Sequence, residues 1–271
     1  LLLAARTCPA GGWFTHSNPF VIGAAGCGVP RMTFCESLPR FNPHQASHWL
    51  ILFGIFTFIQ HHPAGSISMK GQKAVFDVTS KYGTLSEGVQ IPALSELTVC
   101  IDIYLTNTIQ KWAAFTYHIA ASGQDQELAI GSQNNQLTVW LCGTMKETQV
   151  SLSLTTWHSV CVTWSQSSSS LVVYLNGSRK QGYNIPANSI QPRGSLFLGK
   201  YQHSYVNSSK IEFDESWSFL GDLYYFRVWN HSKSSLEIST LDCADGDIIS
   251  WSTKHLNFTS NTLARNPNLR C

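Results

Sequence analysis

The chain has 271 residues, of which 13% are charged and 12% are aromatic, and its formal net charge is +2. So small a net charge, from so few charged residues, excludes the basic footprint of a nucleic-acid-binding protein and a strongly acidic tail. The length allows one large β-domain or two small ones. The many aromatic residues favour a globular extracellular β-protein with large rings in its core.

Residues 49–59 form the only long apolar run of the chain. As a helix they would rise about 16 Å, roughly half of a bilayer core, so the run is too short to span a membrane. It is typical of the apolar part of a signal peptide, which we place at residues 49–68. The small residues Ser66 and Ser68 suit cleavage after Ser68. The alternative is a buried strand or a short core helix.

Residues 1–31 are rich in glycine, alanine and proline and show no sustained helical or strand period. We therefore expect residues 1–48 to be an upstream segment outside the mature fold. Residues 69–271 would then form one domain, because neither an internal repeat nor an inter-domain linker is visible in them.

Short runs of β-branched and aromatic residues recur from Lys73 onward, at intervals typical of a two-sheet sandwich. They predict strands at residues 75–78, 88–91, 97–104, 112–119, 126–130, 136–142, 149–154, 159–164, 171–175, 195–199, 221–229 and 247–251. Asn176-Gly177 predicts a type I′ hairpin turn, since both residues accept a positive φ. Residues 232–241 predict one short helix with Ser232 or Ser234 as its N-cap. The predicted fold is all-β, a two-sheet antiparallel jelly-roll sandwich with one short helix.

Several of these strands carry a recognisable pattern. The pattern consists of Leu97-Thr98-Val99-Cys100-Ile101-Asp102-Ile103-Tyr104, Cys161-Val162-Thr163-Trp164, Leu198-Gly199, Leu220-Gly221-Asp222-Leu223 and Val228-Trp229-Asn230. In order and spacing, over about residues 73–255, it resembles the pentraxin domain of the pentraxin and laminin-G superfamily. Asp242-Cys243, Ser250-Trp251 and the closing Leu269-Arg270-Cys271 resemble the N-terminal pentraxin domains of adhesion G-protein-coupled receptors. The resemblance implies a lectin-like sandwich.

Four cysteines are expected to form two disulfides. A bridge between Cys100 and Cys161 would hold the sandwich across its core and would imply an oxidising compartment. A second bridge between Cys243 and Cys271 would hold the C-terminal tail against the domain. Cys142 is left without a partner, either as a buried apolar filler or as a cysteine for an intermolecular bridge.

Four Asn-x-Ser/Thr sequons occur, at Asn176, Asn207, Asn230 and Asn257. Four sequons within about 80 residues, beside paired cysteines, favour a glycosylated surface on a secreted protein or a cell-surface ectodomain.

The pentraxin resemblance implies a ligand site built on two calcium ions. Asp125 and Gln126 match the Asp and Asn of the family's first ligand loop. Where the family has a Glu-Gln-Asp run, this chain has Tyr201-Gln202-His203. A phenol and an imidazole are poor ligands for a hard cation. We therefore expect the double calcium site to be lost, with Asp125 as its vestige and no cofactor.

Four further residues enter the comparison with the family. Asp214 or Glu215 could stand for a further carboxylate ligand, and Trp217 falls about where the family places an amide ligand. His158, at the start of a strand, is interpreted as a structural residue.

The alternative to a recognition module is an enzyme. Retaining glucanases with a lectin-like fold carry Glu-x-Asp-x-Glu on one strand. Residues 212–216 approach that motif, but Ser216 stands where the second Glu belongs. Since no other catalytic motif occurs in the sequence, we expect no catalysis.

The expected function is that of an extracellular recognition or adhesion module of a cell-surface receptor of the adhesion G-protein-coupled class. It would bind a protein ligand or itself, as a homodimer, without calcium. The alternative is a secreted soluble pentraxin that binds phosphate-bearing or carbohydrate ligands through calcium. Neither alternative involves nucleic acid, and contact with a membrane would come only through a receptor continuation.

Overall fold

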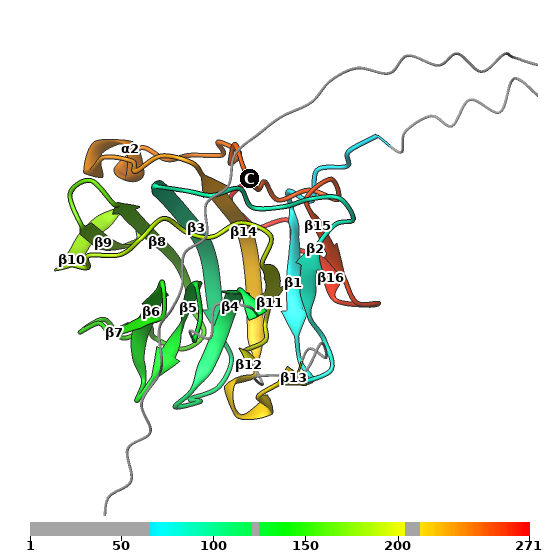
Figure 1. The fold of residues 1–271 in the computed structure, drawn as a ribbon. Helices are drawn as coiled ribbons and strands as arrows, with labels where there is room; N and C mark the ends of the chain where they lie inside the picture. The colour runs from blue at the N-terminus through cyan, green and yellow to red at the C-terminus, as the bar shows by residue number, and fades with distance from the viewer. Residues whose placement is uncertain (1–64, 121–124, 204–211) are drawn as a thin grey trace, which may run out of the picture. The chain divides into compact units, whose positions relative to one another are not determined.

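The computed structural model describes residues 65–120, 125–203 and 212–271. They form two antiparallel sheets of seven strands each and a two-stranded ribbon. The first sheet has the order β10-β9-β8-β3-β14-β1-β16, the second has the order β15-β2-β11-β4-β5-β6-β7, and β12 pairs with β13 (Figure 1). This confirms the predicted all-β sandwich of two sheets.

The strands of the first sheet are β1 (Gln72–Phe76), β3 (Glu96–Leu105), β8 (Trp157–Ser165), β9 (Ser170–Leu175), β10 (Ser178–Asn184), β14 (Gly221–Trp229) and β16 (Leu263–Arg265). Those of the second are β2 (Gly83–Leu85), β4 (Trp112–His118), β5 (Leu128–Gln133), β6 (Gln136–Leu141), β7 (Thr144–Glu147), β11 (Ser195–Leu198) and β15 (Leu256–Phe258). The ribbon is β12 (Gln202–His203) with β13 (Glu212–Phe213), and the described helical segments are η2 (Glu215–Trp217) and α2 (Ser235–Ser239).

The inner faces of the two sheets supply the core. Along β3, the alternate residues Val99, Ile101 and Ile103 are fully buried, as expected for a strand with one face turned inward. Phe115 of β4 and Phe226 of β14 join the two sheets, with ring centroids 4.8 Å apart. An aromatic pair of this kind adds about 0.5–1.5 kcal/mol beyond the burial of its area.

Cys100 of β3 and Cys161 of β8 form the expected disulfide. They are direct cross-strand partners in one sheet, so the bridge does not hold the sandwich across its core, and that part of the expectation is wrong. Because the alternate residues of β3 fill the core, Cys100 lies on the opposite side of the sheet. There Trp229 and Ile238 of α2 pack against it. The disulfide is therefore buried between the first sheet and the helix.

The C-terminal tail adds one strand to each sheet. β15 pairs with β2 in the second sheet, and β16 pairs with β1 in the first. Beyond β16, Cys271 forms the expected disulfide with Cys243. Arg270 adds an ion pair with Asp242, at 2.8 Å. The tail is thus part of the sandwich as well as bridged to it.

The helix and the hairpin turn agree with the sequence in their main points. α2 is shorter than predicted and uses Ser234 as its N-cap, with Glu237 completing a capping box. Asn176 and Gly177 both have positive φ, 51° and 76°, as the predicted turn requires. None of the described helices is long and apolar enough to cross a membrane.

Three predicted strands are wrong. Residues 88–91 begin within a turn, in which Gly88 has a φ of 76° and the Val89 N–H donates to the Ser86 carbonyl at 3.0 Å. Residues 149–154 touch β6 through one backbone bond, from the Leu137 N–H to the Val150 carbonyl. Residues 247–251 form a single bridge at Ile249. In each of the three segments, apolar side chains of the alternation pack against the core and hold a loop there. No neighbouring strand forms a continuous ladder with them among the described residues.

The N-terminal end of the described chain lies against the domain. Ser68 forms an isolated bridge with Ser252, and the Ile67 N–H donates to the Thr253 hydroxyl at 3.0 Å. The upstream segment and the apolar run at 49–59 lie outside the described residues. The signal peptide and its cleavage after Ser68 therefore stay predictions.

Candidate functional site

The positions that correspond to the family's ligand loops surround an aromatic cluster on the outer face of the second sheet. Its base is Trp140 of β6, which is 1% exposed although it faces away from the core. Small side chains beside it, Ala113 of β4 and Ala129 of β5, leave room above the sheet for large rings. Trp140 is directly opposite Ala129 in the ladder.

Two further rings complete the cluster. Tyr201, which precedes β12, stacks on Trp217 of η2 with ring centroids 4.9 Å apart and an interplanar angle of 22°. Both rings meet Trp140 edge-on, at 5.9 Å and 5.5 Å. The Lys111 ammonium lies 5.5 Å from the centre of the Trp217 ring, within cation–π range. We call Trp140, Tyr201, Trp217 and Lys111 the aromatic platform.

Asp125, which the family resemblance implies as the vestige of a calcium site, is bonded to this platform. The Tyr201 hydroxyl donates to Asp125 Oδ1 at 2.6 Å. Burial, together with the bond to Asp125 and its charge, raises the pKa of Tyr201 far above its usual value. The phenol therefore stays protonated and acts as a hydrogen-bond donor. It holds the carboxylate that a calcium ion would need.

Three other carboxylates near the ligand loops also have hydrogen-bond partners in this chain. Glu127 accepts the Gln191 N–H at 2.6 Å, and burial raises its pKa. Asp214 lies 3.1 Å from His203 Nε2 and accepts the N–H of Ser216. Glu215 accepts from Lys200 through both of its oxygens at 2.7 Å. The Lys200 side chain is 2% exposed, so a buried cation takes up this negative charge.

These residues do not fit calcium. Calcium requires six to eight oxygen ligands, several of them charged, whereas every carboxylate named above already binds a donor of this chain. Among the described residues, three side chains of His, Cys, Asp or Glu converge at metal distance only at Asp242, Cys243 and Cys271. The two sulfurs there form a disulfide, which leaves no metal ligand set.

Three buried polar groups of the site lack a hydrogen-bond partner among the described residues. They are the side-chain oxygens of Gln126 and Gln202 and the indole N–H of Trp140. Gln126 is nevertheless fixed in place, because its side-chain amide nitrogen donates to the backbone carbonyl of Gln202 at 2.6 Å. These groups could bind ordered water or a small polar ligand.

The residues of the glucanase-like motif do not lie on one strand. β13 ends at Phe213, and Asp214 leaves the strand to cap η2. Glu212 and Asp214 therefore do not share one strand, unlike the arrangement that the glucanase motif implies. His158 is buried in β8 and lies 3.0 Å from the Ser153 hydroxyl, in keeping with a structural role.

Cys142 is free and half-buried. It follows β6 in a turn with a φ of 46°, so its predicted place within the strand is wrong. Its thiol donates to the Asn188 carbonyl at 3.2 Å. Burial and the neighbouring Glu127 raise its pKa to about 12, which keeps the thiol protonated and favours the apolar filler over an intermolecular bridge.

Three of the four sequon asparagines, Asn176, Asn230 and Asn257, are exposed. Asn207 lies outside the described residues. Exposure is the condition that a glycan needs in the folded domain. Glycosylation at these positions stays a prediction.

The two stacked sheets, with a cross-strand disulfide under a short helix and a bridged C-terminal tail, define a pentraxin-type sandwich. The family model described as the Pentaxin family matches residues 74–265, and the chain belongs to this family.

Similar proteins include adhesion G-protein coupled receptors and a pentraxin. Adhesion G-protein coupled receptor G4 of Homo sapiens is 30% identical over 213 residues, which are 77% of this chain and 7% of the receptor. The full extracellular region of zebrafish Gpr126/Adgrg6 has a TM-score of 0.62 at 21% identity, covering 75% of this chain and 27% of that one. The heptameric SAP-like pentraxin of Limulus polyphemus has a TM-score of 0.58 at 21% identity, covering 73% of this chain and 95% of that one. The chain thus corresponds to a small part of the receptors and to nearly all of the pentraxin.

Proposed function

We propose that this chain is an extracellular, non-catalytic recognition module that works without calcium and associates with itself. Its place would be the N-terminal region of a cell-surface receptor of the adhesion G-protein-coupled class. The observation that carries the proposal is the bond from the Tyr201 hydroxyl to Asp125, beneath the stacked Trp217. Aromatic rings fill the positions at which the family resemblance implies calcium ligands.

The comparisons support the receptor part of this proposal. The chain is similar to a segment of adhesion G-protein coupled receptor G4 and to a segment of an extracellular region of the same receptor class. A module of this kind would bind partners through side chains and sheet edges, as many extracellular sandwiches do.

Among the described edge strands, β7 is the one best suited to self-association. β10 carries two adjacent cations and a bulge, both of which protect an edge. β15 and β16 have only three residues each. Directly after β7, the Thr148 N–H donates to the Leu137 carbonyl of β6, so alternation turns the main chain of Met145 in β7 outward. Met145 is also 40% exposed.

In a twofold dimer, the β7 strands of two copies would pair antiparallel with Met145 at the centre. Lys146 of each copy would then lie opposite Thr144 of the other, so no like charges would be directly opposed.

The calcium part of the proposal is tested by restoring the ligands. Wild-type protein is expected to have the same melting temperature in EDTA and in millimolar calcium. The double variant Tyr201→Glu/His203→Asp restores the carboxylates that the family resemblance implies, and calcium is expected to raise its melting temperature. A site filled at a hundred times its Kd adds about 2.7 kcal/mol.

The matched control is Tyr201→Gln/His203→Asn, which has the same shapes without the charges and should not respond to calcium. A calcium-dependent rise in the melting temperature of the wild type would contradict the proposal. It would favour the alternative, a soluble pentraxin that binds phosphate-bearing or carbohydrate ligands through calcium. The observation on that side is the pair of unsatisfied oxygens on Gln126 and Gln202.

A further inference from the structure

The first described residues of the chain pair with a loop near its C-terminal tail. The Ile67 N–H donates to the Thr253 hydroxyl at 3.0 Å, and the Thr253 N–H donates back to the Ile67 carbonyl at 3.0 Å. Ser68 forms its bridge with Ser252 in the antiparallel sense. Residues 67 and 68 are therefore part of the folded domain, although they precede β1.

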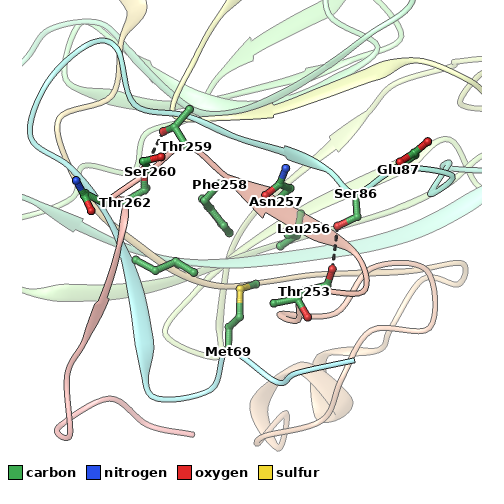
Figure 2. Close-up of a pocket in the computed structure, with 12 residues that line it drawn as sticks. Met69, Ser86, Glu87, Thr253, Leu256, Asn257, Phe258, Thr259, Ser260 and Thr262 are labelled. Atoms are coloured by element: carbon green, nitrogen blue, oxygen red, sulfur yellow. Dashed lines mark hydrogen bonds between the residues drawn. The ribbon is translucent and has the colours of Figure 1, made fainter. Parts of the chain in front are cut away.

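The partner loop is itself held in place. The Ser86 hydroxyl donates to the Thr253 carbonyl at 3.0 Å, a bond drawn as a dashed line in Figure 2. At the other end of the pairing, the Met69 N–H donates to the Trp251 carbonyl at 3.1 Å, and the Trp251 indole N–H donates to the Met69 carbonyl at 3.0 Å. Because the loop is already ordered, this pairing requires the ordering of residues 67–69 alone.

Exposure changes sharply within this pairing. Ile67 is 65% exposed, whereas Met69 is 1% exposed. A charged α-amino group on Ile67 would lie in water and would keep its bond to the Thr253 hydroxyl. A chain that began at Met69 would instead carry that charge at the edge of the core, and it would lack both residues that pair with Thr253 and Ser252. Since a charge is costly to bury unless it is paired and hydrogen-bonded, the domain is better suited to a chain that begins at Ile67.

The sequence offers a processing site at the same point. Signal peptidase requires small residues at positions −3 and −1 relative to the bond that it cuts. Ala64 and Ser66 meet this requirement for the bond between Ser66 and Ile67. Ser66 and Ser68 meet it for the bond two residues later. The two bonds are equivalent by this rule, so the pairing of the folded product is what distinguishes them.

We propose that signal peptidase cuts between Ser66 and Ile67, two residues before the position expected from the sequence, and that the mature domain begins with an α-amino group bonded to Thr253. The Ser66–Ile67 peptide bond is hydrolysed. Water supplies the hydroxyl of the new Ser66 carboxyl group and a proton to the Ile67 nitrogen, and the resulting amine is mostly protonated at pH 7. The inference rests on the extracellular location proposed above and on the signal peptide expected from the sequence.

The experiment identifies the first residue of the secreted protein. The whole chain with a C-terminal tag is expressed in mammalian cells, and the product is purified from the medium. Edman degradation and mass spectrometry of the N-terminal peptide are expected to give Ile67. Met69, or any other first residue, would overturn the inference and leave the extracellular proposal standing. If no product reaches the medium, the extracellular proposal fails with it.

Two matched variants separate the two bonds, because each removes a small residue that only one bond requires. Ala64→Tyr changes position −3 of the earlier bond and should abolish the product that begins at Ile67. Ser68→Tyr changes position −1 of the later bond and should leave that product unchanged. The reverse result, a start that moves in Ser68→Tyr and stays in Ala64→Tyr, would overturn the inference.

The variants also test the value of the pairing. Where Ala64→Tyr moves the cut to the later bond, its product differs from the wild type only in lacking Ile67 and Ser68. Urea unfolding is expected to show an unfolding equilibrium constant about tenfold larger for this product, the factor that two backbone hydrogen bonds give. Equal stability of the two products would contradict the argument that the domain needs Ile67.

Discussion

Replacing both Cys100 and Cys161 with alanine is expected to lower the free energy of unfolding by about 4 kcal/mol. The two cysteines are 61 residues apart in sequence, and the chain-entropy account of a disulfide gives about 4 kcal/mol for a loop of this length. Loss of the sulfurs also weakens the packing between the first sheet and α2, where Trp229 lies against them. Urea unfolding of the wild type and the double variant measures the difference.

Cys142→Ala is the matched control, because it removes a half-buried sulfur that forms no bridge. It should cost less than about 1.5 kcal/mol, since it deletes one small group at a partly accessible position. If the double variant lost no more than this control, the disulfide would not be a main source of stability, and the account of the first sheet would be wrong.

Asp102→Asn is expected to abolish a loss of stability that the wild type shows between about pH 4 and pH 7. Asp102 Oδ1 is buried without a hydrogen-bond partner among the described residues. Burial raises the pKa of this carboxyl from 3.8 to about 6, against the lowering effects of Ser159 and of the charges on Arg227 and Arg270. The folded chain therefore keeps a proton that the unfolded chain releases.

The sign of the effect follows from this difference. A pKa raised in the folded state gives stability that is complete below pH 3.8 and is lost as the pH rises through about 6. The interval between the two pKa values corresponds to about 3 kcal/mol. Denaturant unfolding at pH 4 and pH 7 should show that loss in the wild type, relative to Asp102→Asn. Equal pH dependence in the two proteins would contradict the assignment.

The sequence predicted most of the central strands of the two sheets because their patterns are unambiguous. Apolar residues alternate along β3 and β8, and Asn176-Gly177 specifies a hairpin turn. The edge strands were missed for a physical reason. β10 consists of polar, mostly exposed residues, and β15 has three residues. Such strands are held by their neighbours and carry little pattern of their own.

The candidate site was predicted only in part. The sequence pointed to Tyr201 and His203 as replacements for calcium ligands, but it could not show that Tyr201 donates to Asp125. Trp140 and Lys111 were not anticipated as members of the platform. The sequence did contain a signal for Trp140. It alternates with the core residues Val139 and Leu141 of β6 and therefore lies on the outer face of the sheet, where so large an apolar side chain must be covered by another segment. What covers it comes from η2 and the segment before β12, far along the chain, and strand patterns do not reveal such contacts.

The most direct test of the central claim is sedimentation velocity of the secreted chain across a concentration series, once with calcium and once with EDTA. The account predicts a monomer–dimer equilibrium that is the same in both buffers and that Met145→Lys shifts to monomer, because like charges would meet across the twofold pairing of β7. Assembly that requires calcium, or a larger closed ring such as the heptamer of the Limulus pentraxin, would contradict the claim. A monomer at all concentrations would contradict self-association as well.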